Sequence, residues 1–254
     1  MRVLAVDSAA KHLRGTNESW LETLLTPQRV LPALSQKAGK FTQSEVEIIE
    51  EMIHNFEEDF HSRIEDAAVK QLAALRRCDA SFLQSDKELL DFLHFICLQS
   101  LRTAKMQDNL VAAVQLKPPL RFAPVWQIVR HVFASNMASE LYFDRRDWRL
   151  LFLANSSTRP FVTGDQPVIN TYAVRQPPGK QVDNLEFYYP LSPKLAVLLT
   201  ETASVPNGHC LSLDLQEVDM YNGQIVRSAH EQVYADSRRI LEQIAGGLYD
   251  SQLM

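Results

Sequence analysis

The 254-residue sequence has few cysteines, and it has no long apolar run. Cys78, Cys97 and Cys210 are scattered without the spacing of metal ligands, so a disulfide framework is not expected. No apolar stretch reaches the roughly 18 to 20 residues that span a bilayer, and Met1–Ser8 lacks the basic flank of a signal peptide. We therefore expect a cytoplasmic protein without a membrane segment.

An excess of positive charge is also missing, because the formal net charge is -5. This balance argues against a dedicated nucleic-acid surface, although a local basic patch remains compatible with it. Hydrophobic residues make up 46% and charged residues 22%, which excludes an intrinsically disordered chain.

The common catalytic motifs are absent as well. The sequence has no glycine-rich phosphate loop, no G-x-S-x-G, no H-E-x-x-H and no paired C-x-x-C. This disfavours the usual nucleotide-binding and metalloprotease activities. The cofactor, if there is one, stays unknown.

Helix breakers are missing from a long first part of the chain. Proline is absent from Ala33 to Lys117, and glycine is absent from Lys40 to Thr163. After Pro160, closely spaced prolines separate short runs that are rich in β-branched and aromatic residues. We predict an α+β fold, with a helical N-terminal part packed on a small mixed or antiparallel sheet with C-terminal helices. Its segments are 1–40, 41–145 and 146–254, in one composite domain.

Hydrophobic patterns predict the individual elements. Helices are expected from Thr42 towards Arg77, from Ser85 or Asp86 to about Leu116, after Pro124, over Leu215–Ala229 and over Asp236–Ala245. Strands are expected at Trp148–Leu153, on both sides of Gly164–Pro167, at Leu185–Tyr189 and Leu195–Thr200 as a hairpin, and at Gln232–Ala235. Leu89–Leu98 is apolar all round and should be the most buried helix. Leu195–Thr200 is apolar without alternation and should lie centrally in the sheet.

One pattern resembles a metal site. Glu51-x-x-His54 and Glu58-x-x-His61 repeat a unit that di-iron proteins use, but those proteins take one unit from each of two facing helices. Here both units lie on one helix, separated by roughly 10 Å of rise. We expect a solvated helix flank and no metal.

The most informative segment is Phe161–Val168, in which Gly164 and Pro167 break an apolar strand and leave Asp165 and Gln166 at the break. A carboxylate aimed by a rigid strand end suits a metal ligand or a general base. Alternatively, Asp165 caps its own backbone in an Asx-turn. The residues leave both interpretations open.

Phe161–Val168 resembles the F-I-T-S-D-N-P-V motif of a bacterial family known only as a domain of unknown function, and Phe187–Leu195 is similar to its P-L-S-P segment. Ile96–Thr103, Asn222 and Ala229–Tyr234 resemble further motifs of that family, so the similarity covers roughly residues 45–240. The resemblance implies the architecture and marks these residues, but it names no reaction.

Two departures from the family pattern stand out. Gly164 and Gln166 occupy positions where members usually have Ser and Asn. The H-x-V-P segment of members is missing, since His12 is followed by Leu13-Arg14-Gly15. An activity that needs that histidine would be altered in this chain.

One hypothesis is a hydrolase that acts on a nucleic acid or nucleotide. Asp165 would be the metal ligand or base, and Gln166 and Asn222 would orient the substrate. Further contacts would come from Arg149, Glu186, Ser192 and Lys194. Glu186 does not stand two residues before a lysine, so a D…(E/D)-x-K nuclease core is not matched.

The alternative hypothesis is a non-catalytic module whose helical part binds a protein partner. Arg145, Arg146, Arg149 and Arg159 would suit an anionic ligand, although such a cluster is more often a solvated loop. A pocket centred on Asp165 would favour the enzyme, and an exposed apolar patch elsewhere would favour the module.

Asn222 shares a helical stripe with Val218, Ile225 and Ala229, which should bring its amide into the core. A buried amide requires partners. We expect it to bond to the Thr163–Pro167 turn or to the Pro190–Pro193 turn.

Overall fold

A computed structural model describes residues 62–101, 122–176, 182, 184–202, 204–247 and 249. The helix start at Thr42, the row from Glu51 to His61 and the helix end near Leu116 lie outside these residues, as does His12. The fold is given for the described residues only.

Helices come before the main sheet along the chain, as the long stretches without proline and glycine in this part of the sequence predicted. They are a helix over residues 62–75, the 3-10 turn η1 (Ser81–Gln84), α5 (Asp86–Leu101) and α7 (Phe122–Phe143). Phe92 and Ile96 of α5 are fully buried, and most residues of the second half of this helix are inaccessible. The predicted burial of α5 is confirmed.

The main sheet is mixed, and its strand order is β3-β4-β5-β1-β6. The strands are β1 (Arg149–Asn155), β3 (Ile169–Asn170), β4 (Glu186–Ser192), β5 (Leu195–Thr200) and β6 (Cys210–Leu213). All neighbours are antiparallel except β1 and β6, which are parallel. The predicted hairpin of β4 and β5 is confirmed, and so is the central place of β5. The edge strand β6 was not predicted.

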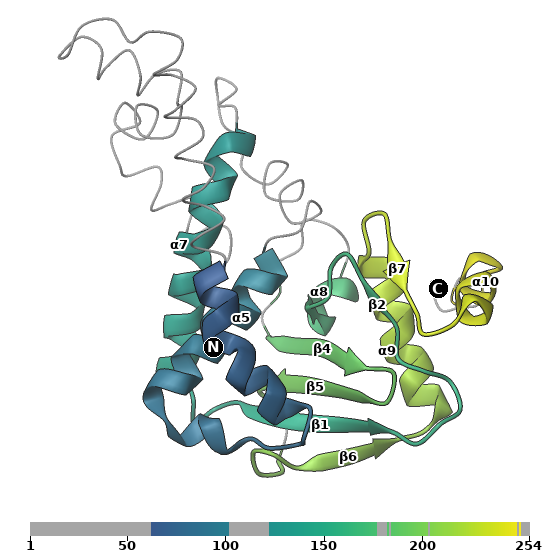
Figure 1. The fold of residues 1–254 in the computed structure, drawn as a ribbon, viewed down its shortest axis with the longest axis horizontal. Coiled ribbons are helices and arrows are strands. Elements are labelled where there is room, and N and C mark those ends of the chain that lie inside the picture. The colour runs from purple at the N-terminus through teal and green to yellow at the C-terminus, as the bar shows by residue number, and fades with distance from the viewer. Residues whose placement is uncertain are drawn as a thin grey trace, which may run out of the picture.

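The elements after β6 lie on the other face of the sheet (Figure 1). They are α9 (Leu215–Ser228), β7 (Val233–Tyr234) and α10 (Arg238–Ala245), with the short helix α8 (Thr171–Val174) beside α9. β7 pairs with β2 (Thr163–Gly164) in a separate two-stranded sheet. An Asp214–Glu217 capping box begins α9.

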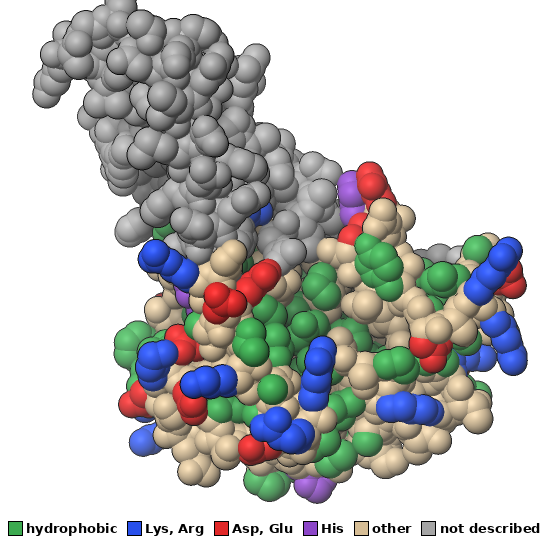
Figure 2. Space-filling model, viewed as in Figure 1, with side chains coloured by type: hydrophobic (Ala, Val, Ile, Leu, Met, Phe, Trp, Pro, Cys, Tyr) green, Lys and Arg blue, Asp and Glu red, His purple; other side chains and the backbone are tan. Residues whose placement is uncertain are grey.

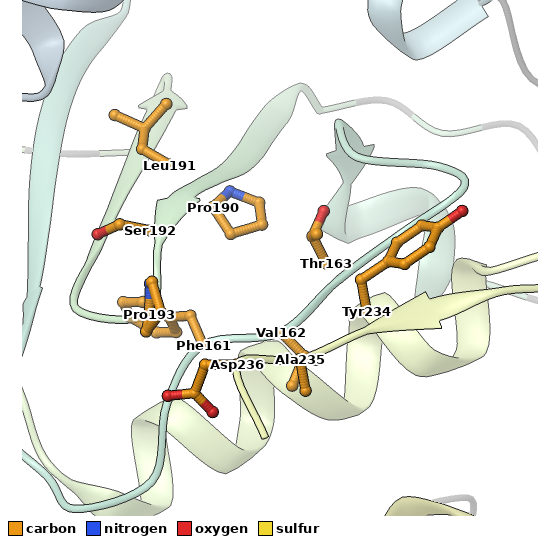
Figure 3. A pocket seen from close by; sticks show the side chains of 10 residues that line it. All are labelled: Phe161, Val162, Thr163, Pro190, Leu191, Ser192, Pro193, Tyr234, Ala235 and Asp236. Carbon is orange, nitrogen blue, oxygen red and sulfur yellow. The ribbon is translucent and has the colours of Figure 1, made fainter. Parts of the chain in front are cut away.

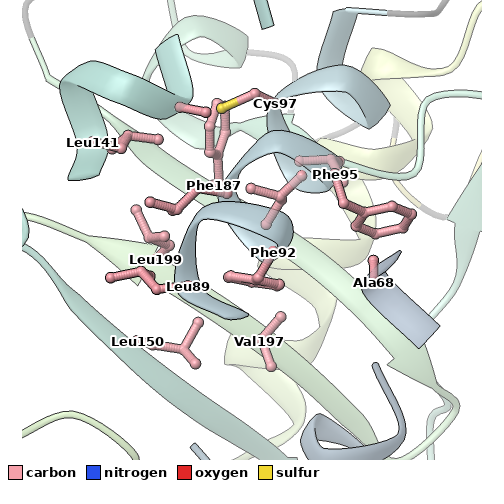
Figure 4. Packing of buried hydrophobic residues seen from close by; sticks show 14 of the residues in the cluster. Ala68, Leu89, Phe92, Phe95, Cys97, Leu141, Leu150, Phe187, Val197 and Leu199 are labelled. Atoms are coloured by element: carbon pink, nitrogen blue, oxygen red, sulfur yellow. The ribbon is translucent and has the colours of Figure 1, made fainter. Parts of the chain in front are cut away.

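Alternation along the strands divides the apolar side chains into two cores. Leu150, Phe187 and Leu199 lie in one row and face the helices, where they join the cluster of α5 and α7 (Figure 4). Leu151 and Tyr188 lie in the next row and face α9. Since helices and sheet share one cluster, the α+β fold is confirmed, whereas the segment boundaries stay predictions.

Candidate functional site

The predicted break in the strand is present. β2 ends at Gly164 and pairs with β7, whereas β3 begins at Ile169 and pairs with β4, so the residues between them connect two sheets. The sequence suggested that Gly164 adopts a backbone conformation closed to other residues, but its φ is not positive. Its importance is a close approach instead, because a β-carbon there would lie 3.1 Å from the Gln232 carbonyl oxygen.

Asp165 connects this break to the segment between α9 and β7. Its carboxylate accepts hydrogen bonds from three backbone N–H groups, those of His230 at 2.8 Å, Glu231 at 2.7 Å and Gln232 at 3.1 Å. The Asp165 N–H donates to the Gln232 carbonyl oxygen at 3.0 Å. The partners therefore lie far along the chain, not in an Asx-turn of its own backbone. A catalytic role of Asp165 stays a prediction.

The electrostatics of Asp165 follow from these bonds. Partial burial acts to raise the pKa of the carboxyl, but the three N–H donors and the neighbouring His230 outweigh it. The pKa of Asp165 consequently lies below its usual value, and the ionised form is favoured. This is the behaviour expected of a carboxylate that organises backbone.

Asn222 is fully buried on α9, as predicted. Its amide donates to the Pro160 carbonyl oxygen at 2.9 Å and to the Tyr249 hydroxyl at 3.2 Å, and its side-chain oxygen accepts from the Val162 N–H at 3.0 Å. The predicted partners were wrong, because the bonds reach Pro160 and Val162, just before the Thr163–Pro167 turn, and Tyr249. Asn222 thus holds in place the residues that lead into that turn.

The predicted basic cluster is engaged in local contacts. Arg159 forms an ion pair with Asp219 of α9 through both carboxylate oxygens. Arg149 donates to the Arg146 and Trp148 carbonyl oxygens, each at 2.7 Å, and Arg145 lies 4.4 Å from the centre of the Tyr142 ring. On the face shown in Figure 2, basic side chains alternate with acidic and polar ones. Among the described residues on this face, the basic side chains therefore do not gather into one anion-binding surface.

Glu186 lies buried at the far end of the β4–β5 hairpin. Its carboxylate accepts hydrogen bonds from the hydroxyls of Thr171 at 2.6 Å and Thr200 at 2.8 Å. Thr200 is in register with both Glu186 and Arg149, which places these two predicted residues in one row. Burial raises the pKa of the nearby Tyr221, and the Glu186 carboxylate raises it further.

Ser192 and Lys194 lie at the opposite end of the same hairpin. The Ser192 hydroxyl accepts from the Lys194 N–H at 3.3 Å, and the Lys194 ammonium donates to the Ser157 carbonyl oxygen. Gln166 is half-buried at the break between β2 and β3. The seven predicted site residues therefore fall into several separate groups and do not form one site.

A groove lies where the segments of the two proline motifs meet. We call it the proline-turn groove; it has a volume of about 230 Å³ and is lined by Phe161–Thr163, Pro190–Pro193 and Tyr234–Asp236. Figure 3 shows the Pro190–Pro193 turn on one side and Thr163 with Tyr234 on the other. Asp165 is not among the lining residues. Asp165 stabilises the groove indirectly, because its hydrogen bonds connect the end of β2 to the segment that leads into β7.

Hydrogen bonds and a register shift give the groove its shape. The Pro193 carbonyl oxygen accepts from the Phe161 N–H at 2.9 Å and from the Asn155 amide at 3.0 Å, which joins the two motif segments. The pairing of β4 with β5 shifts between Pro190 and Ser192, and Leu191 therefore leaves the ladder and lines the groove. Bulges of this kind often redirect side chains at binding sites.

The sequence missed the third wall of the groove. Tyr234 and Asp236 come from β7 and the connection to α10. The sequence placed Tyr234 in a predicted strand and in a segment that resembles the family, but it assigned neither residue to a site. Tyr234 lies opposite Thr163 in the β2–β7 pair and has 49% of its surface exposed. The β2–β7 pairing and the long-range bonds of Asp165 place this segment beside the proline turn.

A family model described as a protein of unknown function (DUF4238) matches residues 38–239. This match spans most of the chain. The chain belongs to the DUF4238 family. No curated protein and no solved structure matches it. In this DUF4238 protein, the two segments that showed the resemblance lie side by side in the proline-turn groove.

Two absences in the described part of this DUF4238 protein concern metal binding and membrane insertion. There, no three His, Cys, Asp or Glu side chains gather as metal ligands would. No helix in these same ranges has the length and apolar character required to cross a membrane.

Proposed function

We propose that this protein is a binding module, in which the proline-turn groove takes an apolar side chain from an extended segment of a protein partner. The observation that supports the proposal is the lining of the groove. It combines prolines and aromatic rings with three hydroxyls and one carboxylate, and it includes no histidine, cysteine, lysine or arginine. Histidine, cysteine and lysine, which commonly serve as base or nucleophile in covalent catalysis, are therefore missing from this lining.

The size of the groove favours a side chain over a small molecule. Its volume of about 230 Å³ falls below the roughly 300–1,000 Å³ of typical ligand pockets. A nucleotide would exceed it, whereas one leucine, proline or phenylalanine anchor would fill much of it. Grooves lined by prolines and aromatics commonly take such extended segments.

The rim of the groove defines the charge of the partner. Asp236 is exposed at the rim, and its carboxylate makes no hydrogen bond or ion pair with the other described residues. Tyr234 presents half of its ring beside it. A partner segment with a lysine or arginine next to the apolar anchor would pair with Asp236 and pack along the Tyr234 ring.

A hydrolase centred on Asp165 has less support. Three backbone N–H groups already occupy both carboxylate oxygens, and Gln166 and Asn222 do not converge on the carboxylate. This geometry favours an organising role. A bacterial origin and a cytoplasmic location stay predictions from the sequence.

The test is an array of acetylated octapeptides, each with a central leucine, phenylalanine or proline and a basic or acidic neighbour. The tightest peptide is then titrated into ¹⁵N-labelled protein. We expect the basic series to bind, with shifts at the amides of Thr163, Ser192 and Ala235. Tyr234→Ala should weaken binding by about tenfold or more. The matched control is Phe143→Ala, an exposed aromatic on α7, which should leave the affinity unchanged.

Two results would contradict the proposal. One is a peptide whose shifts map to the exposed faces of α5 and α7, as a partner of the helical part would require. The other is a metal-dependent phosphodiesterase activity that Asp165→Asn abolishes without changing the thermal midpoint, which would restore the hydrolase hypothesis.

A further inference from the structure

The helix over residues 62–75 ends in a Schellman motif. The Asp79 N–H donates to the Ala74 carbonyl oxygen, and the Cys78 N–H donates to the Leu75 carbonyl oxygen, both at 3.0 Å. Cys78 occupies the left-handed position of this motif, with φ of 56°. Glycine is the residue that this position favours, because a β-carbon is strained there. Cys78 therefore adopts a strained backbone conformation, and its thiol lies at the end of the helix.

A second thiol lies on the same face of the sheet. Cys210 is the first residue of β6, and it is in register with Phe152, whose side chain points into the core below the helices. Cys210 is exposed, as Cys78 is. Because β6 is an edge strand, no further strand among the described residues covers Cys210 on its outer side, towards the end of the 62–75 helix.

The chain segments next to the two cysteines approach each other closely. A β-carbon placed on Gly208 would lie 3.3 Å from the Ala80 β-carbon, so the backbone before Cys210 approaches the backbone after Cys78 closely. Gly208 is held there, because its N–H donates to the Leu150 carbonyl oxygen at 2.8 Å. Partial burial raises the pKa of the Cys78 thiol, and the Cys210 thiol raises it further, as a close second thiol would.

We propose that Cys78 and Cys210 form a redox pair, which a low-molecular-weight disulfide such as glutathione disulfide converts into an intramolecular disulfide. One cysteine thiolate attacks a sulfur of glutathione disulfide and releases one glutathione thiolate. The second cysteine thiolate then displaces the attached glutathione. The two thiols lose two protons and two electrons, and glutathione disulfide gains them as two molecules of glutathione.

The bond would connect the end of the 62–75 helix to the edge strand. In the reduced protein the segments next to these two elements approach each other at Ala80 and Gly208. A covalent link across a long loop restricts the unfolded chain and secures β6 against separation from β1. Cys97 offers an internal control, because it is fully buried in α5 and inaccessible to the oxidant.

The test oxidises the full-length protein with excess glutathione disulfide and compares it with protein kept in dithiothreitol. We expect the intact mass to fall by two hydrogen atoms and a non-reducing tryptic digest to join peptide Cys78–Lys87 to peptide Leu195–Arg227. The thermal midpoint of the oxidised protein should rise by about 5–10 °C. Dithiothreitol should reverse both changes.

Cys78→Ser and Cys210→Ser each keep one thiol of the pair, so they should accept one glutathione without a link or a rise in the midpoint. Cys97→Ala should still form the link. The proposal is overturned if wild-type protein accumulates glutathione on both cysteines, if the digest joins Cys97 to either partner, or if the disulfide joins two chains.

Discussion

At the scale of single residues, Asp165 holds together parts of the chain that no local interaction would join. The ionised form accepts three backbone N–H groups, and its pKa is therefore depressed in the folded protein. A depressed folded pKa stabilises the protein at every pH above the unfolded value of about 3.9. The contribution is lost as the pH falls through the lower folded value.

We predict that Asp165→Asn lowers the free energy of unfolding by about 1–2 kcal/mol at pH 7, because the amide nitrogen cannot accept a hydrogen bond. The difference from wild type should shrink below about pH 4, where the carboxyl is protonated first in the unfolded chain and, at lower pH, in the folded protein. Urea unfolding between pH 7 and pH 2.5 measures this. Asp236→Asn is the control, since Asp236 lacks such bonds, and a gap that stays constant with pH would contradict the assignment.

Asn222 gives the second prediction at this scale. In Asn222→Leu the Pro160 carbonyl and the Val162 N–H lose their buried partner, so we expect a loss of about 1–3 kcal/mol. Met220→Leu on the same helix is exposed and should melt with the wild type. If Asn222→Leu were as stable as this control, water would have to reach the freed groups.

At the scale of elements, the helices and the central hairpin were predictable because each has a continuous local pattern. The unbroken apolar run of Leu195–Thr200 indicated a strand with both faces covered, and β5 is indeed central. β6 escaped prediction because Cys210–Leu213 is short, and its outward residues are exposed at the sheet edge. Its place depends on parallel pairing with β1, which the local sequence does not encode.

The candidate site was predictable only in part, for the same physical reason. The breaks at Gly164–Pro167 and Pro190–Pro193 are local and visible in the sequence. The approach of Tyr234–Asp236 depends on hydrogen bonds between distant segments, and so does the engagement of Asp165. A sequence shows that a carboxylate stands at a strand break, but it does not show which donors surround it.

Burial of α5 leads to a prediction for this element. Phe92 is fully buried and packs its ring 5.2 Å from that of Phe82, so Phe92→Ala should cost about 3–5 kcal/mol. Leu90→Ala is the matched control, because Leu90 lies on the same helix with 38% of its surface exposed. Chemical denaturation of both variants measures the contrast, and similar midpoints would show that α5 is not the centre of the helical core.

At the scale of the whole molecule, one sheet separates two cores of different character. The face towards α5 and α7 is closed mainly by aliphatic and phenylalanine side chains, together with Trp148. The face towards α9 includes the stacked rings of Tyr188 and Tyr221, 4.4 Å apart, and the amide of Asn222. The proline-turn groove opens on this second, more polar side, where replacement of a side chain disturbs hydrogen bonds as well as packing.

The bonds from the side chains of Asp165 and Asn222 to the backbone beside the groove join residues that are 60 to 67 positions apart. Closing such long loops is entropically costly, and contacts of this range form after local ones. We therefore expect the amide protons of His230, Glu231 and Gln232 to exchange with solvent together and faster than those in the second half of α5. Native-state hydrogen exchange at increasing denaturant measures this order. A binding surface that assembles last would also open first, so a bound partner would slow exchange at residues it never touches.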